Sequence, residues 1–429
     1  MSAPPASLPA ALSPVRGGMP GAASPAALEP PRQAAWRAAR RILFVRLDNL
    51  GDVLMSSPAM AAVRQQRPDA HLALLCGGAG AAALPHLPML DEAILYDAPW
   101  VQGSQPRDND GSIDRRLVRR LMQGRFDAAI VFTVCTQSAL PAALLLRQAD
   151  IPLRLAHSRE NPYDLLSDWL REPDAIAPGM RHEVQRQMDL VAAAGLSPMQ
   201  PAGPLVFAVH DADRRAAAAK LAQAGSRPDQ PYVVLHPGAT ASSRRYPLAG
   251  YAAAVARLQQ AGVQVVAVAG GSEGALVAEL QASVAAQGGQ PLPALVGALS
   301  LGELGALIKD AALLIGNNSA PAHLAAAVGT PVVVLYALTN PQHTPWQVPS
   351  RVLFHEVPCR DCLRSTCPMG HHDCLRQVPP QAVAQAALDL LQAAAGAPAS
   401  RSGGGASRPA SVPLSRSAGS PLAQEALQP

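Results

Sequence analysis

Residues 312–335 read ALLIGNNSAPAHLAAAVGTPVVVL, and this stretch decides the fold class of the chain. The runs Ala312–Ile315 and Val332–Leu335 are continuously apolar, as strands are when helices cover both faces of a parallel sheet. Between them, Pro321–Val328 has the composition of a short helix with a proline in its first turn. A strand, a helix and a second strand in this order predict an α/β fold with a parallel sheet.

The same alternation extends over most of the chain in both directions. Further strands are predicted at Ile42–Val45, Leu72–Cys76, Ala93–Tyr96, Ala128–Phe132, Tyr232–Leu235 and Val263–Ala269. Helices are predicted near Ser57–Gln66, Arg181–Ala194, Leu248–Gln260, Glu273–Ala286 and Leu301–Lys309. These elements fall into two groups, which predicts two Rossmann-like parallel-sheet domains facing each other across a cleft.

Length and composition set the expected domain boundaries. A chain of 429 residues fits two domains plus tails. Residues 1–38 and 397–429 are rich in Pro, Ala, Ser and Gly, so we expect them to be disordered tails. The stretch Gly195–Pro204 has the proline and glycine content of a linker. The expected domains are therefore residues 39–200 and residues 201–396.

Charge and hydropathy narrow the class of protein. The net charge is only +4, which does not favour a nucleic-acid partner. No apolar run is long enough for a transmembrane helix, and the first residues lack the pattern of a signal peptide. We therefore expect a cytoplasmic protein. Six cysteines in a chain of this length do not indicate a disulfide framework.

Polar loops follow three of the predicted strands, where ligands of open α/β sheets bind. The first loop contains Arg46, Asp48, Asn49 and Asp52. It is either an active-site loop, or a structural turn in which Asp52 is a helix N-cap and Arg46 its solvated neighbour. The residues of this loop do not decide between the two interpretations.

The second loop, His236–Pro247, has the composition of a phosphate-binding loop. Small residues let the backbone approach a phosphate, and the candidate hydroxyl and guanidinium groups belong to Thr240, Ser242, Ser243, Arg244 and Arg245. The alternative is a polar turn that ends at the proline starting the next helix.

The third loop, Gly316–His323, precedes the helix predicted above. Asn318 or Ser319 can cap that helix, whose unpaired N–H groups then form an anion site, and His323 lies about one turn in. The alternative is a capped helix with a surface histidine.

Taken together, these segments resemble the signature blocks of the family 9 glycosyltransferases, the bacterial lipopolysaccharide heptosyltransferases. The resemblance covers residues 40–390 in order, and GNNSAPAHLAAAVGTP at Gly316–Pro331 is its nucleotide-binding block. It implies the GT-B fold and an inverting transfer of heptose from a nucleotide-sugar, ADP-heptose, to the inner core of lipopolysaccharide. It further implies an acceptor at the inner leaflet, peripheral location at the inner membrane, and no cofactor for catalysis.

The resemblance also implies roles for individual residues. Asp52 matches the general base, and Thr240 and Arg244 match the residues that hold the diphosphate. The nucleotide and phosphates are implied to lie near Asn318, Ser319, Ala320 and His323. The family usually has Asp at the position of Asn318 and Gly at the position of Ala320, and these departures leave the donor open. On the acceptor side, the candidates are Arg46, Asn49, Arg116 and Arg120, although Arg116 and Arg120 also fit a solvated helix face.

Four of the six cysteines fall in one late segment, at Cys359, Cys362, Cys367 and Cys374. A pair two residues apart followed by two further thiols fits a structural zinc ion. An iron–sulfur cluster and four unliganded thiols are the alternatives. A zinc-dependent interaction protein would rest on this segment alone.

Two weaker motifs are also present. Asp108-Asn109-Asp110 and Asp211-Ala212-Asp213 match the Asp-x-Asp pattern of metal-dependent glycosyltransferases, but neither follows a predicted strand, and we expect neither to bind a metal ion. Gly78–Ala83 resembles a dinucleotide fingerprint and supports an NAD-dependent oxidoreductase as an alternative function.

Overall fold

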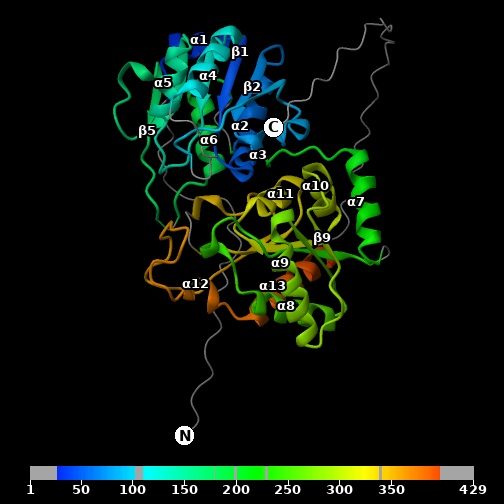
Figure 1. Ribbon diagram of the computed structural model, residues 1–429. Coiled ribbons are helices and arrows are strands. Elements are labelled where there is room, and N and C mark those ends of the chain that lie inside the picture. The colour runs from blue at the N-terminus through cyan, green and yellow to red at the C-terminus, as the bar shows by residue number, and fades with distance from the viewer. Residues whose placement is uncertain are drawn as a thin grey trace, which may run out of the picture.

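The computed structural model describes residues 27–101, 110–177, 179–197, 201–227, 230–337 and 341–396. It contains two six-stranded parallel sheets, with strand orders β3-β2-β1-β4-β5-β6 and β12-β11-β10-β7-β8-β9. Numbered within its own sheet, each follows the doubly wound order 3-2-1-4-5-6. The predicted fold class, two Rossmann-like domains of the GT-B type, is confirmed, and Figure 1 shows the domains one above the other.

The N-terminal sheet consists of β1 (Arg41–Val45), β2 (His71–Cys76), β3 (Glu92–Leu95), β4 (Ala128–Val131), β5 (Leu153–Ser158) and β6 (Asp168–Arg171). Its helices are α1 (Pro30–Ala38), α2 (Leu50–Gln66), α3 (Gly78–Ala81), η1 (Leu84–His86), α4 (Ser112–Gly124), α5 (Leu140–Gln148), η2 (Tyr163–Leu165) and α6 (Glu183–Ala193). Strands β5 and β6 were not predicted.

The C-terminal sheet consists of β7 (Tyr232–His236), β8 (Gln264–Ala269), β9 (Ala294–Val296), β10 (Leu313–Asn317), β11 (Val332–Leu335) and β12 (Ser350–Leu353). Its helices are α7 (Asp211–Gln223), η3 (Ser242–Arg244), α8 (Leu248–Gln260), η4 (Gly271–Glu273), α9 (Gly274–Ala286), α10 (Leu301–Asp310), α11 (Ala320–Val328), η5 (Pro341–His343), α12 (Asp373–Arg376) and α13 (Pro380–Gly396).

The strand order places the three polar loops at the switch points of the sheets. In the N-terminal sheet the connections diverge between β1 and β4, and the loop with Asp52 directly follows β1. In the C-terminal sheet they diverge between β7 and β10, which are followed by the loops containing Arg244 and Asn318. Ligands of doubly wound sheets bind at these points.

The two domains share part of their hydrophobic core. One cluster of buried apolar side chains includes Val53 and Leu54 of α2 as well as Leu324 and Ala325 of α11. Helix α2 packs directly on α11 across the domain boundary, as Figure 1 shows. The loops that precede these two helices are therefore brought face to face.

The expected boundary of the N-terminal tail was wrong. Residues 30–38 form α1, and the Trp36 side chain is fully buried, with its indole N–H donating to Asp168 Oδ2 at 3.0 Å. A single large aromatic ring outweighed the disorder-prone composition around it. Helix α2 also begins at Leu50 rather than near Ser57, with Pro58 inside it. The tail predicted at 397–429 lies outside the described residues.

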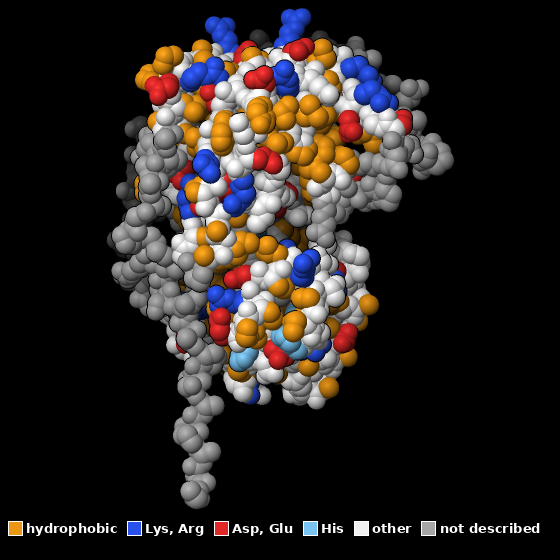
Figure 2. Space-filling view, turned by 90° about the vertical axis from the view of Figure 1, so that its left-hand side faces the viewer, with side chains coloured by type: hydrophobic (Ala, Val, Ile, Leu, Met, Phe, Trp, Pro, Cys, Tyr) orange, Lys and Arg blue, Asp and Glu red, His pale blue; other side chains and the backbone are white. Residues whose placement is uncertain are grey.

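The surface carries no dominant charge on the face shown in Figure 2, where basic and acidic side chains are interspersed over both domains. Among the residues that the structure describes, no helix combines the length and apolar character that a membrane span requires.

We expect Trp36→Ala to lower the free energy of unfolding by about 3–5 kcal/mol, because it leaves a cavity and removes an indole from a buried site. Chemical denaturation measures this change. Trp169→Ala is the matched control, because that indole is 37% exposed and should cost much less. Equal losses in the two variants would show that α1 does not contribute to the core.

Candidate active site between the two domains

A buried guanidinium organises the loop after β1. Arg46 is fully buried, so it is not the solvated residue of the structural interpretation. Its three nitrogens contact three carboxylates: Asp48 at 3.2 Å, Asp52 at 3.0 Å and Glu183 at 3.0 Å. Burial lowers the pKa of Arg46, but the three carboxylates outweigh that effect and raise it. One positive charge among three negative ones leaves this loop with an excess of negative charge.

Asp52 is the third residue of α2 and not its N-cap. The N-cap is Asn49, whose backbone N–H donates to Asp52 Oδ2 at 3.2 Å, as in a capping box. Burial raises the pKa of Asp52, but the charges of Arg46, His343 and His323 outweigh it, and the pKa lies below its ordinary value. Asp52 is therefore an ionised carboxylate at the domain boundary.

The neighbouring carboxylate, Asp48, differs in its titration. Burial first, and then the charge of Asp52, hold the pKa of Asp48 above its ordinary value, although Arg46 opposes them. Asp48 accepts a hydrogen bond from Gln137 Nε2 at 2.6 Å. It also lines a cavity of about 280 Å³ at the ends of β1 and β4, together with Trp100, Thr133 and Ser138. This cavity therefore adjoins the carboxylate of Asp48.

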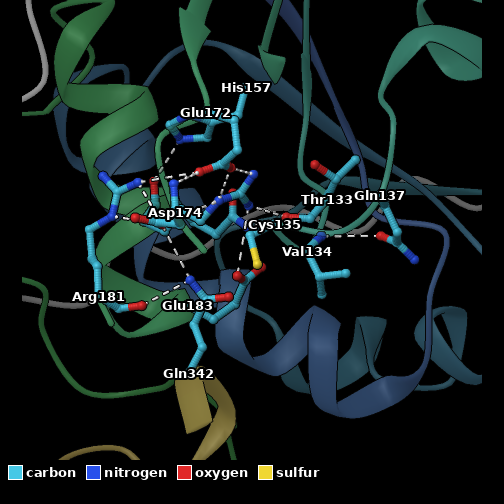
Figure 3. Close-up of polar contacts among 12 residues, drawn as sticks. Thr133, Val134, Cys135, Gln137, His157, Glu172, Asp174, Arg181, Glu183 and Gln342 are labelled. Atoms are coloured by element: carbon cyan, nitrogen blue, oxygen red, sulfur yellow. Dashed lines mark hydrogen bonds and ion pairs between the residues drawn. The ribbon is translucent and has the colours of Figure 1, made fainter. Parts of the chain in front are cut away.

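A buried ionic network, shown in Figure 3, connects Glu183 to the rest of α6 and to the strand ends. Arg186 is 1% exposed, donates to Glu172 Oε2, and lies 3.7 Å from Glu183 Oε2. Gln342 reaches this network from the C-terminal domain, and its Nε2 donates to the backbone oxygen of Arg181 at 2.8 Å. The start of α6 is thereby fixed both to Arg46 and to the opposite domain.

The predicted phosphate loop, His236–Pro247, follows β7. Hydrogen bonds fix this loop without using the Arg244 side chain. Asn317 is fully buried, and it donates to Pro237 O and accepts from the Tyr246 backbone N–H. Arg245 donates to Ala239 O at 2.8 Å within the loop. Among the described residues, the structure records no hydrogen bond or ion pair for the Arg244 side chain. Its charge lowers the pKa values of His323 and His343, so it lies near the boundary.

The first turn of α11 is open toward the boundary. Ser319 is the N-cap residue, but its hydroxyl donates to Asn317 O at 3.3 Å and makes no cap hydrogen bond. The Asn318 backbone N–H donates to Leu335 O at 3.1 Å. The expectation of a cap by the Ser319 side chain is therefore wrong, and the N–H groups near Ala320 are not blocked by Ser319. Such N–H groups favour an anion.

His323 makes a close contact between the domains. A Cβ atom on Gly51 would lie 2.6 Å from His323 Cδ2, so only glycine fits at that position of α2. His323 is buried, which contradicts the alternative of a surface histidine. Burial, together with the nearby charge of His343, lowers the pKa of His323 to about 4. The ring is therefore neutral at pH 7 and lies between Asp52 and Arg244.

Of the acceptor-side candidates on α4, Arg120 lies away from this site. Arg120 Nη2 contacts Glu92 Oε1 at 2.6 Å, and Glu92 is the first residue of β3. Arg116 donates to Ser112 Oγ at 3.2 Å. Since the site is at the carboxyl ends of the strands, the structure does not bring Arg120 to it.

The cysteine-rich segment packs against the phosphate loop. The backbone N–H of Ser243 donates to Ser365 O at 3.2 Å, and its hydroxyl donates to Arg364 O at 2.7 Å. Burial, and then the thiols of Cys367, Cys359 and Cys362, raise the pKa of Cys374 to about 11. The four thiols are neighbours, but no three of their sulfurs lie within 4.8 Å of one another as placed. A shared ion would require these side chains to move together.

The structure describes the weaker motifs only in part. Asp108 and Asn109 lie outside the described residues, and Asp211 and Asp213 lie in the first turn of α7. Gly78–Ala81 is a single helical turn, too short for the helix that a dinucleotide fingerprint opens.

Glu183, His343, Gln137 and Trp100 were missed as site residues. Glu183 begins α6, which the apolar spacing had identified only as a packed helix. His343 follows β11, so the rule that found the other loops could have found it.

Comparison with known proteins agrees with this geometry. The family model of glycosyltransferase family 9 (heptosyltransferase) matches residues 114–372, more than half of the chain. Lipopolysaccharide heptosyltransferase 3 of Escherichia coli is 26% identical over 331 residues, covering 72% of this chain and 89% of that protein. Lipopolysaccharide heptosyltransferase 2 of Salmonella typhimurium is 25% identical and covers 82% and 98%.

Solved structures agree on the fold. The glycosyl transferase family 9 structure from Veillonella parvula superposes with a TM-score of 0.68 at 20% identity, covering 82% of this chain and 98% of that one. The E. coli ADP-heptose LPS heptosyltransferase II superposes with a TM-score of 0.63 at 23% identity, covering 83% and 99%. The chain belongs to glycosyltransferase family 9, the heptosyltransferase family.

Proposed function

We propose that this protein transfers a heptose from ADP-heptose to the inner core of lipopolysaccharide, with inversion at the anomeric carbon. One observation carries the proposal: His323 of α11 contacts Gly51 beside Asp52, and the charges of Asp52 on one domain and Arg244 on the other both act on the pKa of His323. A base and an anion site at one boundary suit a displacement in which a diphosphate leaves. The relatives named as lipopolysaccharide heptosyltransferases support the choice of substrates.

In this mechanism, Asp52 accepts the proton of an acceptor hydroxyl as its oxygen attacks the anomeric carbon. The bond from that carbon to the diphosphate oxygen breaks at the same time. The charge that develops on the leaving group is stabilised by Arg244, by the hydroxyls of Thr240 and Ser242, and by the N–H groups at the start of α11. Asn318 and Ala320 would lie beside the nucleotide. No metal ion is needed for this step, because these groups supply the positive charge.

The acceptor is proposed to enter from the cavity beside Asp48. Its walls mix apolar and hydrogen-bonding groups, among them Trp100, Gln137 and Ser138. Arg46 and Asn49 fix the loop that carries the base, and Arg46 acts as a positioning residue because its side chain is fully buried. The proposed location is the cytoplasm, at the inner leaflet where the acceptor would be presented.

We further propose that the cysteine-rich segment holds one structural zinc ion, because the spacing of its four thiols suits tetrahedral coordination. Cys359 Sγ lies 3.7 Å from His371 Nε2, so a histidine is also at hand. Ser243 donates hydrogen bonds to the backbone oxygens of Ser365 and Arg364. An ordered cysteine-rich segment would therefore also stabilise the phosphate loop.

Asp52→Asn should lower turnover by about 10²-fold or more, because it removes a general base at nearly constant geometry. The amide oxygen can still accept from Asn49 and Arg46, so donor affinity and melting temperature should change little. Asp48→Asn is the control and should have a modest effect. Near-normal turnover in the Asp52 variant would return this residue to a purely structural role in α2.

Arg244→Ala should weaken ADP binding by about 1.5–3 kcal/mol, the contribution of hydrogen bonds to charged groups. Binding of adenosine, which has no phosphates, should change little. Calorimetry with both ligands measures the difference. Arg245→Ala is the matched control, because that side chain is bonded within its own loop. If ADP and adenosine lose affinity equally, Arg244 does not contact the diphosphate.

Protein purified without added zinc should contain zinc that Cys362→Ser removes, and the same substitution should weaken ADP binding. Metal analysis and thiol titration of both proteins test this. Wild-type protein in which the four late thiols react freely, with neither zinc nor iron present, would contradict the proposal.

A further inference from the structure

A second group of potential ligands lies where the chain crosses between the domains. We call His86, His210 and Asp213 the linker cluster. One ligand atom from each of the three side chains lies within 4.8 Å of the other two. His86 ends η1 of the N-terminal domain, His210 directly precedes α7, and Asp213 lies in the first turn of α7. The cluster therefore joins residues from both sides of the boundary.

Both imidazoles of the linker cluster are oriented by backbone carbonyls of the opposite segment. His86 Nδ1 lies 2.8 Å from Ala208 O, and His210 Nε2 lies 2.9 Å from Pro85 O. A carbonyl oxygen only accepts, so each of these nitrogens carries the proton. In the neutral form of each ring, the other nitrogen has a lone pair that a metal ion can accept. Histidines that ligate metals are held in this way, with the second nitrogen donating to a carbonyl or carboxylate.

The remaining contacts fix two of the three side chains. His86 is buried and stacks on Phe207, with ring centroids 4.3 Å apart and planes 15° from parallel. Asp213 packs against Gly302, where a Cβ atom would lie 2.6 Å from the carboxyl carbon. The missing side chain at Gly302 leaves room for the carboxylate. His210 is exposed, so the cluster is open to solvent on that side.

We propose that the linker cluster binds one zinc ion, with water as its fourth ligand. Two neutral imidazoles and a carboxylate are a ligand set that zinc accepts. Ligand atoms at about 2.1 Å from a tetrahedral ion are roughly 3.4 Å apart, so separations of up to 4.8 Å need to shorten by at most about 1.4 Å. The bound ion would connect η1 to α7 and thereby tie the two domains together beside the active site. This inference does not depend on the proposed reaction.

The test is a calorimetric titration of the full chain with zinc chloride after removal of loosely bound metal. The wild type should bind zinc at a site that Asp213→Asn and His210→Ala each weaken by about tenfold or more. Mutating a residue that only hydrogen-bonds to a metal ligand already causes a loss of this size. Zinc should raise the melting temperature of the wild type more than that of either variant. Any ion held by the cysteines is common to all these proteins, so the difference reports the linker cluster.

Asp211→Asn is the matched control, because it removes the same charge from the same turn of α7 and should bind zinc as the wild type does. Equal zinc binding by Asp213→Asn and Asp211→Asn would overturn the proposal. It would also be overturned if His210→Ala bound zinc as tightly as the wild type does. Melting temperatures without zinc show whether each variant is folded. Turnover is measured separately, so failure of this site leaves the proposed reaction untouched.

Discussion

The guanidinium of Arg46 is fully buried, and the arrangement of the active site depends on how its charge is balanced. Its carboxylate partners come from the loop after β1 and from the start of α6. Removing this guanidinium would cost about 3–5 kcal/mol, because it would leave buried carboxylates without a compensating charge. The loop and the helix are therefore held in one position relative to each other.

The second domain is oriented by its contacts with this loop and this helix. The start of α6, fixed by Glu183, receives Gln342 from the C-terminal domain, and His182 Nε2 bonds to Thr344 O at 2.9 Å. On the other side of the loop, Gly51 receives His323. The contacts of Gln342, His182 and His323 thus orient the proposed anion-binding loops toward Asp52, and of these three residues only His323 is implied to lie near the nucleotide.

Much of this could be predicted from the sequence, because the responsible signals are local. Apolar runs predicted the central strands of both sheets. Polar residues after those strands predicted the three loops that the switch points bring together. The linker cluster and Glu183 could not be found in this way, since their partners are distant in sequence and only tertiary packing joins them. Trp36 was missed for a different reason: its surroundings have a disorder-prone composition, and one buried indole decides their structure.

The imidazoles that cross the boundary also bear on how the domains separate. The low pKa of His323 keeps its ring uncharged at neutral pH, and burial likewise lowers the pKa of His343, 4.0 Å from Glu183. In the part of the chain that the structure describes, parting the domains here breaks dispersion contacts and hydrogen bonds, but no ion pair between two permanently charged side chains. Salt screens exposed charges over about 10 Å at 0.1 M, and the contacts of His323 and His343 involve few exposed charges. Opening for substrate entry and product release should therefore respond to temperature and cosolvents far more than to ionic strength.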